Sequence, residues 1–318
     1  MRRLIECVPN FSEGRDRERI AALAAAMNGV KGAWVLDVHS DPDHNRSVFT
    51  LAGEREPVTE AALRGVAKAV EFIDLRGHRG EHPRIGAIDV LPFVPIEGVS
   101  MEDCVALARR TGAEIWARHA LPVYFYEEAA LRPERKRLES VRSGEFEYLR
   151  DEVQRNPDRT PDIGGPSLHP SAGAVAVGAR RFLIAYNINL DTPDVAIANR
   201  IARAIRASSG GLPHVKAIGV ELKHRKLAQV SINLTDFEQT SIRRVFDAVR
   251  LEARRHGCSI RSSEIVGLVP RKALGPEDIA YLQLENFSPA EKILETRLEV
   301  KINEEAPGGI SLRSRMGC

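Results

Sequence analysis

The stretch that decides the fold is residues 215–234, VKAIGVELKHRKLAQVSINL. Its two halves, 215–222 and 227–234, are rich in strand-forming residues, and a polar turn containing His224 joins them. The second half alternates strictly, with Val230, Ile232 and Leu234 on one face and Gln229, Ser231 and Asn233 on the other. We therefore predict two paired strands with one buried face and one face of neutral hydrogen-bonding groups.

On each side of this hairpin, the pattern predicts a helix next to the hairpin and a strand beyond that helix. The helices are predicted over 193–207 and 237–255, and the outer strands over 181–190 and 260–270. The order is βαββαβ, which favours a sheet with helices packed on one face.

The first half of the chain has the same order of elements, although its sequence differs. Strands are predicted over 4–8, 33–39, 46–51 and 85–93, helices over 16–27 and 57–73, and a further helix and strand over 100–117 and 122–126. We therefore predict an α+β fold of two βαββαβ-like (ferredoxin-like) subdomains, residues 1–178 and 179–318, each with a mixed sheet. A Pro- and Gly-rich segment, 142–178, lies between them, and its long loop over 157–172 is expected to be functional.

Composition excludes several classes of function. The 318 residues include 46 basic and 44 acidic side chains, which argues against a nucleic-acid-binding protein. No apolar run approaches the roughly 20 residues of a membrane span, and the apolar stretch at the N-terminus is too short for a secretion signal. The four cysteines are scattered, as in a protein of a reducing compartment. We expect a cytoplasmic protein that binds neither nucleic acid nor membrane.

Residues 77–86, GHRGEHPRIG, are the strongest functional signal. His78 and His82 lie four apart in a glycine-rich turn that also contains Arg79 and Arg84. This composition suits a site that holds an anionic ligand beside a neutral base at physiological pH. The alternative is a solvated turn with incidental histidines.

Two other features have alternative interpretations. Asn187 and Asn189 share a strand face, as do Gln229 and Asn233, and amide-rich faces can recognise a heterocycle with amide-like edges or can be solvated. The segment 39–44 contains two histidines and two aspartates, which could bind a metal. An ordinary β-turn explains the same residues, and no metal is predicted.

Six segments together resemble glutamate formiminotransferases (formimidoyltransferases). They are residues 6–14 (ECVPNFSEG), 79–84 (RGEHPR), 122–126 (PVYFY), 178–190 (GARRFLIAYNINL), 229–234 (QVSINL) and 264–270 (EIVGLVP). They follow the family's order along nearly the whole chain. The resemblance is to the stand-alone transferase, without the cyclodeaminase domain of longer members.

This resemblance implies transfer of the formimino group from N-formimino-L-glutamate to N5 of tetrahydrofolate in histidine degradation. It also implies a homodimer and a ligand cleft between the two subdomains. His82 matches the family's catalytic histidine, and residues 164–173 match its folate-binding loop. That loop comprises Gly164, Gly165, Pro166, Ser167, Leu168, His169, Pro170, Ser171, Ala172 and Gly173.

Further substrate and folate contacts are predicted from strand faces. Arg46 and Arg84 are expected to bind the glutamate carboxylates, because a guanidinium can grip a carboxylate with two hydrogen bonds. Asn10, Asn187 and Asn233 are expected to contact the folate. His39 is a candidate contact where animal members have an aspartate, and Ala172 stands where they have a tryptophan. These departures leave open which carboxylate assists His82 and whether a side chain stacks on the pterin.

Other functions remain open on the same residues. Formyl transfer between 5-formyltetrahydrofolate and glutamate, or formimino transfer from formiminoglycine, would use the same fold. A metal-dependent amidohydrolase and a non-catalytic folate carrier are more distant alternatives.

Overall fold

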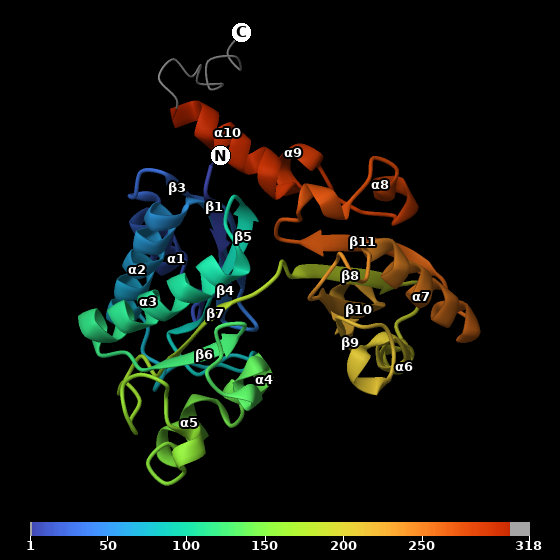
Figure 1. Cartoon of the computed structure of the whole chain (residues 1–318). Helices are drawn as coiled ribbons and strands as arrows, with labels where there is room; N and C mark the ends of the chain where they lie inside the picture. The colour runs from blue at the N-terminus through green and yellow to red at the C-terminus, as the bar shows by residue number, and fades with distance from the viewer. Residues whose placement is uncertain (1, 306–318) are drawn as a thin grey trace. The chain divides into compact units, whose positions relative to one another are not determined.

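The computed structural model describes residues 2–305, apart from the side chain of His224. These residues form two compact units, divided in the sequence between Arg180 and Arg181 (Figure 1). Each unit has its own sheet and its own buried hydrophobic cluster. Within residues 2–305, no helix combines the length and apolar character needed to cross a bilayer.

The N-terminal unit is built on a mixed seven-stranded sheet. Its strands are β1 (Leu4–Cys7), β2 (Asn10–Phe11), β3 (Ala33–Asp41), β4 (Arg46–Glu54), β5 (Ile88–Glu97), β6 (Val123–Glu127) and β7 (Val175–Ala179). β1 and β2 are separated by Val8 and Pro9, and both pair antiparallel with β4 and with β5. β3 pairs antiparallel with β4, while β7 and then β6 extend the sheet beyond β5 in parallel.

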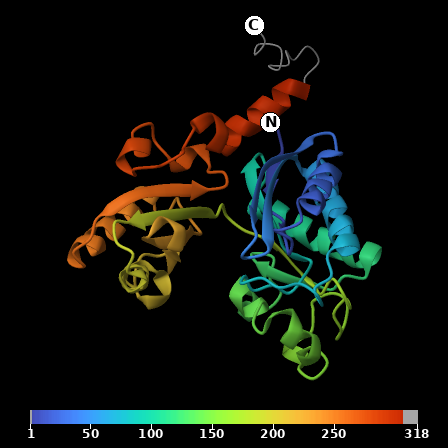
Figure 2. The same cartoon turned by 180° about the vertical axis from the view of Figure 1, so that it is seen from behind.

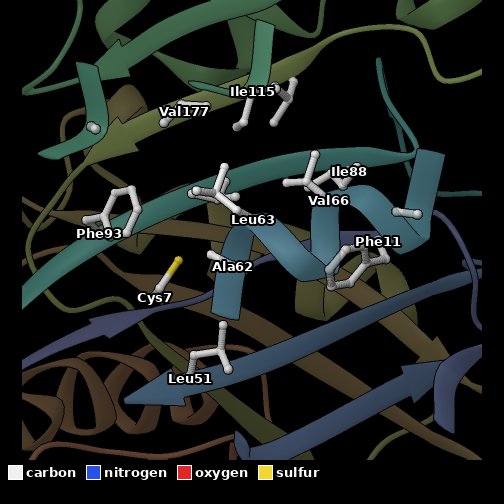
Figure 3. Close-up of a cluster of buried hydrophobic side chains, with 14 of the residues drawn as sticks. Cys7, Phe11, Leu51, Ala62, Leu63, Val66, Ile88, Phe93, Ile115 and Val177 are labelled. Atoms are coloured by element: carbon white, nitrogen blue, oxygen red, sulfur yellow. The ribbon is translucent and has the colours of Figure 1, made fainter. Parts of the chain in front are cut away.

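Three helices pack on one face of this sheet: α1 (Arg17–Asn28), α2 (Arg55–Phe72) and α3 (Met101–His119). α1 begins at Arg17 because the Asp16 carboxylate accepts hydrogen bonds from the first free N–H groups of the helix. A capping box between Ser100 and Asp103 starts α3 in the same way. Figure 3 shows the core between these helices and the sheet, where side chains such as Phe11, Leu51 and Phe93 are fully buried.

Two short helices, α4 (Leu138–Val141) and α5 (Glu145–Glu152), cover part of the opposite face. Their apolar residues Val141 and Leu149 pack with Tyr124 and Tyr126 of β6 in a separate buried cluster. This second layer exists because β5, β6 and β7 are apolar on both faces and so require cover on both.

The C-terminal unit is a four-stranded sheet in the order β11-β8-β10-β9. Its strands are β8 (Ile184–Leu190), β9 (Val215–Leu222), β10 (Leu227–Leu234) and β11 (Ile260–Val266). The helices α6 (Val195–Ile205) and α7 (Ile242–Arg255) pack on one face through Ile201 and Phe246. After β11 come α8 (Asp278–Tyr281), α9 (Pro289–Lys292) and α10 (Leu294–Glu305). Figure 2, the view from behind, shows β8 and β11 running side by side.

The predicted α+β fold with two βαββαβ subdomains is confirmed, with three differences. The C-terminal sheet is antiparallel throughout rather than mixed, because every neighbouring pair in the order β11-β8-β10-β9 runs in opposite directions. Helices cover both faces of the N-terminal sheet, not one. The segment 142–178 contains α5 and β7 in addition to its long loop. The cleft between the subdomains stays a prediction.

Candidate active site

Three loops of the N-terminal unit meet at Asn45, in the turn between β3 and β4. Asn45 is buried and has a φ of 47°, a left-handed conformation that asparagine tolerates well. Its side-chain amide donates to the Arg79 carbonyl and accepts from the Gly14 N–H, both at 3.0 Å. One side chain therefore joins the β3–β4 turn to the loop after β2 and to the turn that carries His78 and His82.

Gly80 allows the third of these segments to approach the first. A Cβ atom on Gly80 would lie 2.2 Å from the carbonyl oxygen of His44, a distance that no side chain can adopt. The resulting contact brings His82 over the start of β4, and the His44 and His82 ring centroids are 5.8 Å apart. A small pocket forms here, lined by Ser12, His44, Asn45, Arg46, His78, His82, Arg84 and Asp89.

His82 is held by both of its ring nitrogens. Nδ1 lies 2.8 Å from the carbonyl oxygen of Pro83, and Nε2 lies 2.7 Å from Nη1 of Arg46. A carbonyl can only accept and a guanidinium can only donate, so the proton is on Nδ1 and the Nε2 lone pair faces Arg46. Burial, and then the charges of Arg46 and Arg142, lowers the pKa of His82 from its ordinary 6.5 to about 3. The imidazole is therefore neutral at physiological pH.

Arg46 is a cation without a direct ion pair in the described part of the chain, although the charges of Asp89 and Asp41 act on it. Its second terminal nitrogen donates to the side-chain oxygen of Asn10, while its Nε is buried and has no hydrogen-bond partner. Among the side chains that the structure describes, Arg46 forms no ion pair. Burial, and then the neighbouring charge of Arg142, lowers the pKa of Arg46 to about 10. A guanidinium in this situation is a ready site for an anion, because pairing offsets the cost of burying its charge.

A second buried arginine lies beside this pair. Arg142, just after α4, forms an ion pair with Asp89 of β5, and Asp89 also accepts from the Ile85 N–H at 2.9 Å. The Nε of Arg142 is buried without a partner, as in Arg46. Asp89 is therefore the direct partner of Arg142, and Arg46 is the cation next to His82 that has no carboxylate of the described residues in direct contact.

Arg84 lines the pocket but has carboxylate partners from the protein itself. Its terminal nitrogens donate to Glu145 at 2.8 Å and to Glu147 at 2.6 and 2.9 Å. Its Nε donates to Nδ1 of His78 at 3.1 Å, and Nε2 of His78 donates to the Asn45 carbonyl at 2.9 Å. Both nitrogens of the buried His78 are thus occupied, and burial lowers its pKa. The geometry favours a supporting role for Arg84 and His78 beneath His82.

The loop 164–173 is anchored at its ends and open in its middle. Gly165, Pro166, Ser167 and Pro170 are exposed, and Gly164, Leu168, His169 and Ser171 are partly exposed. At the C-terminal end, His169 and Gly173 exchange backbone hydrogen bonds of 2.8 and 3.0 Å, and Gly173 forms a bridge with Gly86. Because the Gly86 carbonyl accepts from the Ser12 hydroxyl at 2.7 Å, this end of the loop adjoins the pocket.

Comparisons with known proteins agree along most of the described chain. The profile of the formiminotransferase domain, N-terminal subdomain, matches residues 4–180, and that of the formiminotransferase domain matches residues 185–302. The chain belongs to the formiminotransferase family. These matches confirm the family membership that the sequence analysis expected, and they confirm that the protein is an enzyme.

Curated relatives extend this result. The formiminotransferase chain is 45% identical to the glutamate formimidoyltransferase of Streptococcus pyogenes serotype M1, over 94% of this chain and 99% of that protein. It is 47% identical to the glutamate formimidoyltransferase of Thermoplasma acidophilum, over 95% and 99% respectively. It is also 42% identical to the formimidoyltransferase-cyclodeaminase of Mus musculus, over 95% of this chain and 56% of that protein.

The remaining predicted residues of this formiminotransferase are not among those that line the pocket. His39 is exposed on β3, opposite Val48, and does not line the pocket. Asn187 and Asn233 lie in the C-terminal unit, on β8 and β10. Ala172 is fully buried in the core, so its side chain cannot stack on a ligand in this arrangement. Within residues 2–305, no group of three or more His, Cys, Asp or Glu side chains is arranged to hold a metal ion.

Sequence reasoning missed several residues of the site: the pocket residues Ser12, His44, Asn45 and Asp89, and Arg142 beside them. The only signal for Asn45 was its place in a turn-forming stretch, DPDHNR, where asparagine favours a left-handed backbone. Asp89 was the one charge inside the apolar strand 85–93, and a buried charge demands a partner. Nothing in the sequence pointed from Asp89 to Arg142, which lies 53 residues later.

Proposed function

We propose that this formiminotransferase transfers the formimino group of N-formimino-L-glutamate to N5 of tetrahydrofolate, giving 5-formiminotetrahydrofolate and L-glutamate in histidine degradation. The observation that supports this best is the pair of His82 and Arg46: a neutral base in contact with a cation that has no carboxylate of the described residues in direct contact. The names of the Streptococcus and Thermoplasma relatives favour glutamate as the amino acid.

His82 is the proposed acid–base catalyst. N5 of tetrahydrofolate attacks the amidine carbon, and the new N5–C bond gives a tetrahedral intermediate while Nε2 of His82 accepts the N5 proton. The imidazolium then returns this proton to the glutamate nitrogen as the bond from carbon to that nitrogen breaks. The hydrogen bond from Nδ1 to the Pro83 carbonyl fixes the tautomer that keeps Nε2 unprotonated at the start.

Arg46 is the proposed ligand of a substrate carboxylate. A carboxylate that accepts a hydrogen bond from its Nη1 atom would take that donor away from His82. Nε2 of His82 would then be free for the N5 proton, and the neutralised guanidinium would no longer oppose its protonation. Asn10 holds the other edge of Arg46 and acts here as a positioning residue.

The folate is assigned to the loop 164–173 and to the C-terminal residues Asn187 and Asn233. The exposed middle of the loop, residues 165–167, offers backbone groups, and Asn233 is exposed on its strand. Because Arg84 is paired with Glu145 and Glu147, we assign the substrate carboxylate to Arg46 rather than to Arg84.

The test is tetrahydrofolate-dependent turnover of N-formimino-L-glutamate. His82→Ala should lower kcat by ~10²- to 10⁴-fold while the protein stays folded, the usual contribution of a general acid–base group. His119→Ala, at the end of α3, is the matched control and should turn over at the wild-type rate. Folate binding without turnover of this donor would reject the assignment in favour of formiminoglycine or 5-formyltetrahydrofolate as donor.

Three further proposals concern the protein as a whole. We propose that the protein is a cytoplasmic homodimer. We also propose that each subunit has two subdomains, residues 1–178 and 179–318. The break between compact units at Arg180 supports the subdomain boundary. Sedimentation velocity and cell fractionation would test the oligomeric state and the location.

A further inference from the structure

The C-terminal sheet has a polar face on the side that α6 and α7 do not cover. Strand register places its side chains in two rungs across three strands. One rung is Gln229, Asn189 and Ser262, and the next is Ser231, Asn187 and Glu264. The alternate residues Val230, Ile188 and Ser263 point to the other face and are fully buried. Glu264 is the one charged member of these two rungs on β8, β10 and β11.

Glu264 is oriented by two amides. Its Oε1 accepts from the side-chain nitrogen of Asn187 at 3.1 Å and from that of Gln229 at 3.1 Å. Gln229 is itself buried and donates to Asn189 at 2.9 Å, and Asn189 donates to Ser262 at 3.0 Å. The carboxylate therefore has little freedom to rotate.

The other oxygen of Glu264 is left for a ligand. A carboxylate oxygen accepts about two hydrogen bonds, so Oε1 is saturated by its two amides. Oε2 has no hydrogen-bond partner among the described residues, and Glu264 forms no ion pair with any side chain that the structure describes. The nearby Glu285 differs, because Arg225 pairs with it at 2.8 Å. Glu264 is thus a positioned, half-buried anion whose charge attracts Arg225 without forming an ion pair with it.

We propose that Glu264 is the residue of this face that recognises the 2-amino-4-oxopyrimidine edge of the pterin of tetrahydrofolate. That edge presents an N3–H and a 2-amino group side by side, and two adjacent N–H donors match a carboxylate oxygen with two open lone pairs. The site deepens the proposed function and rests on it. On the same face, Ile218 of the edge strand β9 lies opposite Ser231 with 59% of its surface exposed, and it offers an apolar surface to the rest of the ligand.

Glu264→Gln is an unusually direct test of this role. The new amide must place its oxygen toward the N–H donors of Asn187 and Gln229, because its NH2 group cannot accept from them. Its NH2 group then stands where Oε2 was and confronts the donors of the pterin. The network within the protein is kept, while the acceptor that faces the ligand becomes a donor.

The measurement is the Kd of 5-formyltetrahydrofolate by titration calorimetry, with wild type and Glu264→Gln. The variant should bind about 10- to 100-fold more weakly, the usual effect of losing a hydrogen bond to a charged group. Glu221→Gln is the matched control, since Glu221 is exposed on β9 and points to the opposite face from Gln229. It should bind as wild type does.

The 2-desamino analogue of 5-formyltetrahydrofolate separates recognition from a structural effect. Wild type should lose affinity for it, whereas Glu264→Gln should bind the analogue and the parent compound nearly equally. Equal binding of the parent by wild type and Glu264→Gln would overturn the inference, as would the same loss for the analogue in both proteins. Wild-type turnover of N-formimino-L-glutamate in either case would show that the proposed function stands. No turnover and no folate binding by wild type would reject both.

Discussion

Replacing Arg46 with glutamine should raise the pKa of His82. Glutamine can still donate to Nε2 of His82, but it removes the positive charge that lies 2.7 Å from that nitrogen. No carboxylate of the described residues contacts Arg46 directly, so the removal of its charge should raise the pKa of the imidazole. The prediction tests the central claim of the proposed mechanism, that the state of Arg46 controls the basicity of His82.

The expected rise in the pKa of His82 depends on how much of its lowering comes from the charge of Arg46 and how much from burial and the charge of Arg142. A pKa near 3 rather than 6.5 corresponds to about 5 kcal/mol against protonation of His82. Burial, the largest cause, remains in the variant, as does the charge of Arg142. Two charges about 4 Å apart interact by about 4 kcal/mol at an effective dielectric constant of about 20, so the Arg46 term has an upper limit of about 3 pKa units. We therefore expect a rise of between about 1 and 3 units.

The assay is nuclear magnetic resonance of ¹³C-labelled histidine rings as a function of pH. The chain has nine histidines, and the spectrum of His82→Gln identifies the resonance of His82. In the wild type without substrate this ring should stay neutral from pH 8 down to pH 5, and in Arg46→Gln it should titrate at a higher pH. L-glutamate added to wild type should shift the titration in the same direction, because its carboxylate neutralises Arg46.

The control is Arg76→Gln, which removes an exposed arginine of the same turn and should leave the His82 titration unchanged. If His82 titrates at the same pH in Arg46→Gln as in wild type, burial alone sets its pKa. The proposed link between carboxylate binding and the base would then be refuted.

Other consequences of the structure can be measured directly. Arg84→Met should lower the free energy of unfolding by about 1–3 kcal/mol in urea titrations, because Glu145 and Glu147 lose their partner but remain partly solvated; a raised KM at unchanged stability would instead support a role in substrate binding. Asn45→Ala should lower the free energy of unfolding by about 2–3 kcal/mol, since two hydrogen bonds are lost and alanine is strained at this φ. Asn45→Gly loses the same bonds without the strain and should be more stable than the alanine variant by about 1 kcal/mol. Because the pKa of His82 is lower in the folded than in the unfolded chain, the unfolded state binds more protons between pH 6.5 and 3, and stability falls as pH falls through this range. Between pH 8 and pH 5, the free energy of unfolding of His82→Gln should therefore fall by about 2 kcal/mol less than that of wild type. An identical fall in both proteins would mean that His82 is protonated in the folded protein at pH 5.

The parts of the fold that could be predicted are those with a clear periodicity. Val230, Ile232 and Leu234 alternate with polar residues because β10 has one buried and one polar face, and the predicted bounds of β9 and β10 match the structure. β7 was missed because it is buried on both faces and shows no alternation. Its residues, VAVGA, are also small and follow a loop rich in proline and glycine, which hides a strand.

The candidate site was predictable in its residue types but not in its partners. The composition of residues 77–86 indicated a neutral base near arginines, and the structure places His82 beside an arginine. That arginine is Arg46, 36 residues earlier, rather than the adjacent Arg84. Arg84 is neutralised by Glu145 and Glu147, which lie 61 and 63 residues later and which only the packing of α5 brings near. Counter-charges of this kind depend on tertiary contacts, and no local pattern reports them.

The surroundings of His82 suggest why the arrangement would suit a transferase. Catalytic histidines often donate to a carboxylate, which raises the basicity of the ring before any substrate arrives. His82 donates instead to the Pro83 carbonyl, and its second nitrogen faces the cation of Arg46. Such a base is weak until an anion neutralises that cation, and both proposed products and substrates carry carboxylates. Proton transfer would then be confined to complexes in which the amino-acid substrate is already bound. The contact between His82 and Arg46 would thus make substrate binding precede proton transfer.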